Sequence, residues 1–75
     1  MNNAIWKQNF VKAEQAVAGG DRHITRQKQL IAELERDGHD GEAARALLVQ
    51  FESTQALHIA HRDRLRRQLE RQNAT

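Results

Sequence analysis

The chain has 75 residues, a formal net charge of +2 and no Cys. This length allows one domain, whose core is marginal by itself. The lack of Cys excludes disulfides, thiolate metal sites and Cys nucleophiles, and it fits a reducing compartment. No apolar run approaches the ~20 residues of a membrane-spanning helix, and the N-terminal residues lack the basic start and apolar stretch of a signal peptide. We therefore expect a cytoplasmic protein that does not enter a membrane.

The first predicted element is a helix over about residues 4–36. Asn2 or Asn3 is expected to cap its N-terminus, and Arg36 suits its negative C-terminal end. The Gly19-Gly20 pair opposes a continuous helix, because each glycine costs about 1 kcal/mol relative to alanine in a helix interior. The apolar spacing nevertheless continues through this pair without gain or loss of a residue. We therefore expect one helix that bends or frays locally.

A turn is expected over about residues 37–41, followed by a second helix over about residues 42–72. Gly38 is the predicted left-handed residue after the first helix. Asp40 is the predicted N-cap of the second helix, and Glu42 suits its first turn. Two arms of ~30 residues, at about 1.5 Å per residue, would form a rod roughly 45 Å long.

Both predicted helices carry an alternating four-three spacing of residues that would face a partner helix. An average spacing near 3.5 residues is typical of left-handed coiled coils. In the first helix these stripe positions are Trp6, Phe10, Ala13, Val17, Gly20, Ile24, Gln27, Ile31 and Leu34. In the second helix they are Ala44, Leu48, Phe51, Gln55, His58, Arg62, Leu65 and Leu69. The predicted fold class is therefore all-α, an antiparallel two-helix hairpin that resembles a coiled coil.

Some apolar side chains of a single hairpin would stay exposed to water. These are Leu30, Leu47, Leu57 and Ile59. We expect a second copy to cover them, giving a homodimer that is an antiparallel four-helix bundle. The residues predicted to form this interface, or one with another partner, are Trp6, Phe10, Val17, Ile24, Ile31, Leu34, Leu48, Phe51, Leu65 and Leu69. An aromatic pair near a chain end, here Trp6 and Phe10, is also a typical anchor for a different protein.

Four stripe positions are polar and form a predicted polar core layer. They are Gln27, Gln55, His58 and Arg62. The favoured interpretation is that this layer fixes register and partner number, as buried amides do in coiled coils. The alternative is a recognition or proton-sensing layer, because His changes charge near neutral pH. Gly20 is expected to lie beside His58 and make room for its imidazole, and Arg62 to reach water or Glu14.

Charge is unevenly distributed along the chain. The stretch from Asp37 to Glu52 is acidic, whereas the stretch from Arg62 to Arg71 is rich in arginine. Folding back would add Lys7 and Lys12 to the arginine-rich end, giving a rod with an acidic tip and a basic base. Such a rod would pair head to tail with itself or offer its base to an acidic partner.

Nucleic-acid binding is an alternative interpretation of the arginine-rich end. Arg64, Arg67 and Arg71 follow one line of the helix and would neutralise phosphates. Asp63 and Glu70 interrupt this positive field, and neither a DNA-reading helix pair nor a stacking aromatic accompanies it. A solvated face is therefore the favoured interpretation.

No motif supports a catalytic, cofactor or metal site. The chain lacks a Gly-rich phosphate loop and a nucleophile with a base at a recognisable spacing. His58 and His61 are three residues apart, but no Glu-x-x-His or His-x-x-x-His pair supplies the ligand geometry of a bundle metal site. His23 and His39 are expected to be exposed. We therefore expect a protein that is not an enzyme and uses no cofactor or metal.

A longer pattern covers about residues 15–66. It consists of His23-Ile24-Thr25-Arg26-Gln27, Leu30-Ile31, Asp37-Gly38-His39-Asp40, Ala44, Leu47-Leu48, Phe51-Glu52, Gln55, His58 and Arg62-Asp63-Arg64-Leu65. This pattern resembles a group of short bacterial proteins that have no assigned activity. The resemblance implies a shared hairpin and carries over no activity, cofactor or site. The sequence thus predicts a small interaction or structural module, with a weak nucleic-acid-associated protein as the alternative.

Overall fold

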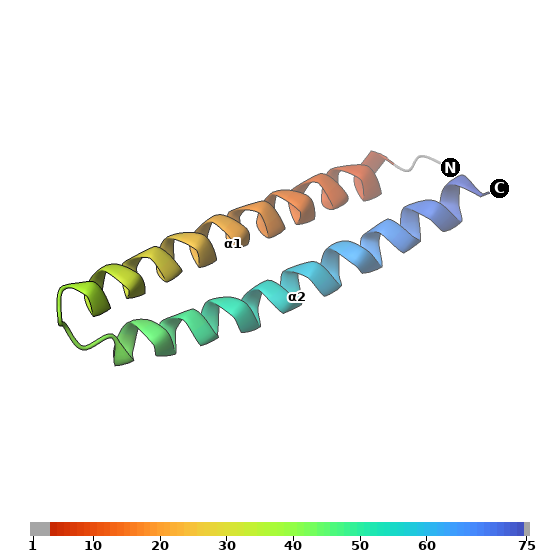
Figure 1. Ribbon diagram of the computed structural model, residues 1–75. Coiled ribbons are helices and arrows are strands. Elements are labelled where there is room, and N and C mark those ends of the chain that lie inside the picture. Colours follow the sequence, from red (N-terminus) through yellow and green to blue (C-terminus); the bar gives the residue numbers. More distant parts are fainter. Residues whose placement is uncertain (1–3, 75) are drawn as a thin grey trace.

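The computed structural model describes residues 4–74 and shows an antiparallel helical hairpin (Figure 1). Helix α1 spans Ala4–Arg36 and helix α2 spans Glu42–Asn73. The start of α1 and the end of α2 lie at the same end of the molecule, which extends over 59 × 14 × 14 Å. The predicted all-α hairpin is confirmed, and residues 4–74 contain no strand.

Helix α1 continues through the Gly19-Gly20 pair without a break, as the apolar spacing predicts. The bounds of both helices agree with the predicted ranges to within one residue. The predicted caps Asn2 and Asn3 lie outside the described residues. Two helices of nearly equal length therefore face each other along most of the chain.

The turn depends on the left-handed conformation of Gly38, whose φ is +77°. The N–H of Gly38 donates to the C=O of Glu35 at 3.2 Å, and the N–H of His39 donates to the C=O of Leu34 at 2.8 Å. This pair of bonds is a Schellman motif, which satisfies carbonyl groups at the end of a helix. Gly38 therefore has its predicted role, because residues with a Cβ atom rarely adopt this φ.

The start of α2 differs from the prediction by one residue. The N-cap is Gly41, not Asp40, and no side chain forms the usual cap hydrogen bond. The carboxylate of Asp40 instead accepts a hydrogen bond from the backbone N–H of Glu42 at 2.9 Å. Asp40 still satisfies one free N–H group of the first turn, from one position further out than expected.

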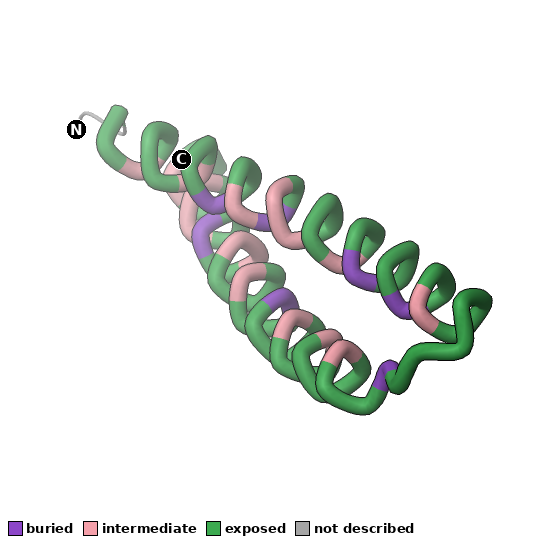
Figure 2. Tube along the Cα trace, turned by 90° about the vertical axis from the view of Figure 1, so that its left-hand side faces the viewer, coloured by how far each residue is buried: buried purple, intermediate pink, exposed green. Residues whose placement is uncertain are grey.

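The core is a single seam between the two helices (Figure 2). Every stripe position predicted from the sequence is buried or half-buried. The most buried apolar residues are Ala13, Val17, Ile31 and Leu65. No side chain of the described residues is fully buried, because each helix covers only one face of the other. The hairpin therefore has a thin core.

Large apolar side chains remain exposed outside the seam, as predicted. The exposed fraction is 43% for Leu30, 40% for Leu47, 71% for Leu57 and 36% for Ile59. Despite this apolar surface, neither described helix combines the length and the apolar character needed to cross a membrane.

Candidate functional site

Two buried glutamines tie the helices together across the seam. Gln27 of α1 donates from Nε2 to the backbone C=O of Ala44 in α2 at 2.8 Å. Gln55 of α2 donates from Nε2 to the backbone C=O of Val17 in α1 at 2.8 Å, and to Oδ1 of Asp21 at 2.9 Å. Both glutamines are more than nine-tenths buried. The two amides therefore bond across the seam in opposite directions, and they hold the helices in one lengthwise alignment.

Gly20 makes room for Gln55. A Cβ atom added to Gly20 would clash with Oε1 of Gln55 and would lie 2.6 Å from its Cδ. The predicted pairing of Gly20 with the imidazole of His58 is therefore wrong by about one helical turn. The reason is that the four-three spacing repeats along each helix, so it specifies the face that meets the partner helix and leaves the lengthwise alignment open.

The amide of Gln55 has only one orientation that fits its surroundings. Its partners, the C=O of Val17 and the carboxylate of Asp21, accept hydrogen bonds, so the amide nitrogen has to face them. The oxygen Oε1 then lies over Gly20, where it is buried and has no hydrogen-bond partner within residues 4–74. Most buried polar atoms have a partner. Oε1 of Gln55 is thus an unsatisfied acceptor in the seam.

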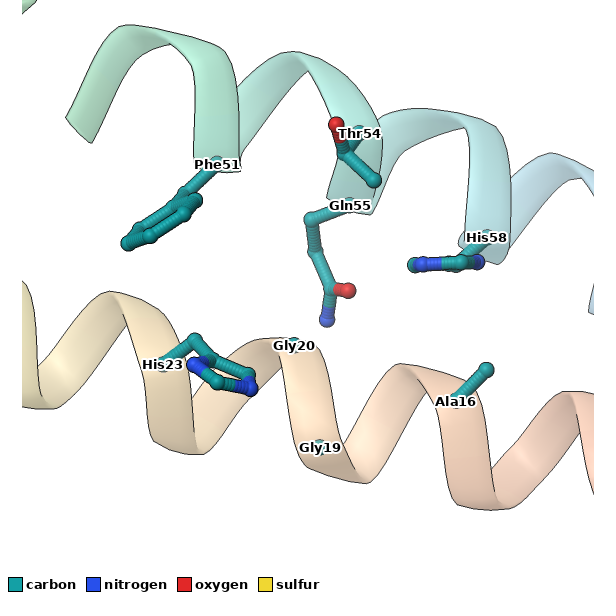
Figure 3. A pocket seen from close by; sticks show the side chains of 8 residues that line it. All are labelled: Ala16, Gly19, Gly20, His23, Phe51, Thr54, Gln55 and His58. Atoms are coloured by element: carbon teal, nitrogen blue, oxygen red, sulfur yellow. The ribbon is translucent and has the colours of Figure 1, made fainter. Parts of the chain in front are cut away.

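A hollow of about 440 Å³ opens on one side of the seam beside Gln55 (Figure 3). It is lined by Ala16, Gly19, Gly20, His23, Phe51, Thr54, Gln55 and His58. In Figure 3 the side chain of Gln55 extends from α2 towards α1, between those of Phe51 and His58. The walls of the hollow are therefore formed mainly by small and aromatic residues, and Gln55, which carries the unsatisfied acceptor, lies among them.

His23 contributes to this hollow in a way that the sequence does not reveal. The residue is exposed, as predicted, but its ring lies 5.8 Å from that of Phe51, measured between centroids. The sequence signal that could have placed His23 beside the hollow is its spacing along α1. His23 lies two helical turns from Ala16 on one side and two turns from Leu30 on the other, so all three follow one line beside the seam.

Gly19 differs from its neighbour Gly20. A Cβ atom added to Gly19 would meet only Nη2 of Arg22, at 3.8 Å, which is ordinary van der Waals contact. No contact within the hairpin therefore requires glycine at position 19. It nevertheless costs about 1 kcal/mol of helix propensity relative to alanine.

The two sides of the seam differ in their chemistry. On the side away from the hollow, a line of charged residues follows α1: Lys7, Glu14, Asp21, Lys28 and Glu35. Glu35 forms an ion pair with Arg45 of α2 at 3.0 Å, and Asp21 accepts the hydrogen bond from Gln55. On the hollow side the corresponding line is Asn9, Ala16, His23 and Leu30. Polar contacts thus close one side of the seam, while the other is open around the hollow, with Arg22 and Arg26 beside Gly19 and His23.

Arg62 lies half-buried over the seam and pairs with Asp63 of its own helix, where water or Glu14 was predicted. Its Nε and Nη2 donate to Oδ1 of Asp63 at 3.1 and 3.0 Å, and Arg66 pairs with the same oxygen. The hydrogen bond from Arg62, assisted by that from Arg66 and opposed by desolvation, lowers the pKa of Asp63 below its usual value. The ionised Asp63 therefore neutralises part of the arginine-rich end.

The other arginines of the arginine-rich end lie at the surface of α2. Arg64 and Arg67 are exposed and form no ion pair within residues 4–74. Arg71 donates a hydrogen bond to Oε1 of Gln68 at 2.7 Å. The described part of the chain brings together no group of three or more side chains that could hold a metal ion.

The ten residues predicted for an interface with another chain all lie in the seam of the hairpin itself. Val17, Ile31 and Leu65 are buried there. The half-buried members are Trp6, Phe10, Ile24, Leu34, Leu48, Phe51 and Leu69. The larger part of any surface for a second molecule therefore comes from residues that flank this seam.

No protein-family model, curated protein or solved structure matches this chain. The resemblance to short bacterial hairpin proteins stays a prediction.

We predict that, in the monomeric hairpin at low chain concentration, Gly20→Ala is destabilising and Gly19→Ala is stabilising. Both changes gain about 1 kcal/mol of helix propensity. At position 20, however, the new methyl group displaces the buried amide of Gln55, and an unpaired buried polar group costs about 1–3 kcal/mol. Thermal unfolding followed by circular dichroism measures both effects. In a Gln55→Ala background, Gly20→Ala should become stabilising. A higher melting temperature for Gly20→Ala alone would contradict the contact described.

We also predict that replacing Gln27 and Gln55 together by Met preserves the helices but loosens their lengthwise alignment. Met has a shape similar to that of Gln, and its added apolar burial offsets the lost hydrogen bonds, so the melting temperature should stay equal or rise. Because the chain has no Cys, spin labels can be attached at the exposed positions Gln15→Cys and Ala60→Cys. The narrow distance distribution of the parent should broaden or split. An unchanged distribution would mean that apolar packing alone sets the alignment.

Proposed function

We propose that this protein is a non-enzymatic interaction module that self-associates, two hairpins forming an antiparallel four-helix bundle. The observation that carries the proposal is the exposure of Leu30, Leu47 and Leu57 beside a seam without a fully buried side chain. Apolar burial contributes about 25 cal/mol per Å², and two helices alone bury little. A second hairpin supplies the missing cover. The absence of Cys suits a reducing compartment, so we place this module in the cytoplasm.

The charge distribution favours antiparallel pairing of two copies. At the turn end, residues 33–45 hold five acidic and two basic side chains. At the open end, residues 7–14 and 62–71 together hold seven basic and three acidic side chains. Antiparallel copies bring unlike ends together at both ends of the rod, whereas parallel copies bring like ends together. Complementary charges of this kind set orientation and speed association.

The main prediction is that the chain is dimeric at micromolar concentration. Sedimentation equilibrium should give twice the mass of the chain, and the melting temperature should rise with chain concentration, because association stabilises the folded state by mass action. Raising the salt concentration should weaken the dimer, since part of the attraction is between exposed charges. A chain that stays monomeric up to ~100 µM, where even weak dimers of Kd near this value are half-formed, would contradict the proposal.

A second candidate function is weak binding of nucleic acid at the open end. It is favoured by one observation: Arg64 and Arg67 are exposed and unpaired within residues 4–74, in contrast to Arg62 and Arg66, which are neutralised by Asp63. Unpaired guanidinium groups on a rigid helix can contact phosphates and release counterions.

This second candidate predicts binding that falls steeply with salt. Changing Arg64, Arg67 and Arg71 to Gln should abolish binding to a DNA or RNA strand without loss of helix content. The control variant changes Arg22, Arg26 and Arg36 to Gln, which removes the same charge elsewhere and should weaken binding far less. Fluorescence anisotropy at increasing salt gives the slope, which reports how many phosphates are neutralised. No binding at ~50 mM salt would eliminate this candidate.

A further inference from the structure

We propose that the second copy docks on the hollow side of the hairpin, with the two hollows facing each other and the two rods antiparallel. This inference rests on the self-association proposed above and identifies the surface that performs it. The surface, named here the hollow face, consists of Ala16, Gly19, His23, Leu30, Leu47, Thr54 and Leu57. Ala16, His23 and Leu30 follow one line of α1, and Leu47 and Thr54 are likewise two turns apart on α2.

Covering the hollow face with a second copy costs less free energy than covering the opposite side of the seam. Its leucines are exposed, Leu57 by 71%, and burying them is favourable. The opposite side also exposes apolar residues, including Val49 by 61%. However, these lie along the charged line of α1 and beside the ion pair of Glu35 with Arg45. Covering that side would take these charges out of water, which costs more than their pairing returns.

The glycine at position 19 is accounted for by the close approach of a second copy, and not by a contact within the hairpin. Within residues 4–74, its added Cβ atom would meet only the end of Arg22, yet the residue lines the hollow. A position without a side chain lets another helix approach closely. Gly19 therefore keeps the hollow open for the second copy, whereas Gly20 keeps space for Gln55.

A second copy over the hollow also shields the hydrogen bonds of Gln55. Gln55 lines the hollow, and its Nε2 donates to the C=O of Val17 and to Oδ1 of Asp21. Its Oε1 is enclosed within the hairpin, out of reach of a second chain. Excluding water from the hollow lowers the local dielectric, which strengthens the hydrogen bonds that this amide forms across the seam.

The ends of the hollow face complement each other in the antiparallel orientation. The tip of one copy carries Glu33 and Asp37, and the open end of the other carries Arg64 and Arg71. Arg64 forms no ion pair inside the hairpin. Antiparallel docking therefore brings the acidic tip of each copy to the arginine-rich end of the other, whereas the parallel arrangement places the acidic tips together.

The test compares two glutamate substitutions on the same helix. Leu57→Glu lies on the hollow face and Val49→Glu on the opposite side, and both replace an exposed apolar side chain by the same charge. Gly19→Gln is the third variant, because it fills the hollow while raising helix propensity. Helix content by circular dichroism establishes that each variant is folded. Sedimentation equilibrium of the full chain then gives each dissociation constant.

Leu57→Glu and Gly19→Gln should each weaken self-association at least about tenfold, and Val49→Glu less than about twofold. The inference is overturned if Val49→Glu weakens the dimer as much as Leu57→Glu, or if Gly19→Gln leaves the dimer intact. Those outcomes leave the proposed function standing, because the parent still dimerises. A monomeric parent chain would instead overturn the proposed function and the docking surface together.

Orientation is measured separately by spin labels at the tip and at the open end. Both His39→Cys and Gln8→Cys are at exposed positions. In a mixture of tip-labelled and end-labelled chains, antiparallel copies should give short distances between molecules. Tip-labelled chains alone should give distances approaching the 59 Å length of the rod. Short distances between two tip labels would overturn the antiparallel arrangement.

Discussion

The crossed hydrogen bonds of Gln27 and Gln55 are the constraint on which the rest of the hairpin depends. Apolar side chains hold the two helices together, but their repeating spacing is compatible with more than one lengthwise alignment. The two amides remove this freedom, because each has to meet a particular backbone carbonyl on the opposite helix. The requirement for glycine at position 20 then follows from the space that the amide of Gln55 occupies. The orientation of that amide also leaves its oxygen unsatisfied beside the hollow.

The two sides of the seam also differ in the side chains that they present to a partner. Asp21 receives the second hydrogen bond of Gln55 on the charged side, and the ion pair of Glu35 with Arg45 closes the same side near the turn. The other side has small residues and exposed leucines in the equivalent positions. A hairpin with one closed and one open side offers a single preferred surface to a partner. This asymmetry is what turns a thin, marginal core into a specific interaction module in our proposal.

The sequence predicts the helices, the turn and the buried stripes well, because these depend on local spacing and on single residues with strong preferences. The left-handed Gly38 is an example, since few other residues tolerate its φ. The lengthwise alignment was not predictable in the same way. A repeating pattern is compatible with several alignments, and the choice depends on Gln55 reaching a backbone carbonyl that no sequence pattern marks. The partner of Arg62 was missed for a similar reason, because a neighbour on the same helix competes with a residue across the seam.

The start of α1 and the end of α2 lie at the same end of the hairpin, which affects how copies of it can be joined covalently. Helix α1 begins where α2 ends (Figure 1), so two parallel hairpins in one polypeptide would need only a short connection. Two antiparallel hairpins place these ends at opposite ends of the bundle. A single-chain version then needs a linker that spans about the 59 Å length of the rod, which is roughly 18 residues of extended chain at ~3.3 Å each. Gene duplication and fusion would therefore preserve the antiparallel bundle only if a long connecting segment were acquired at the same time.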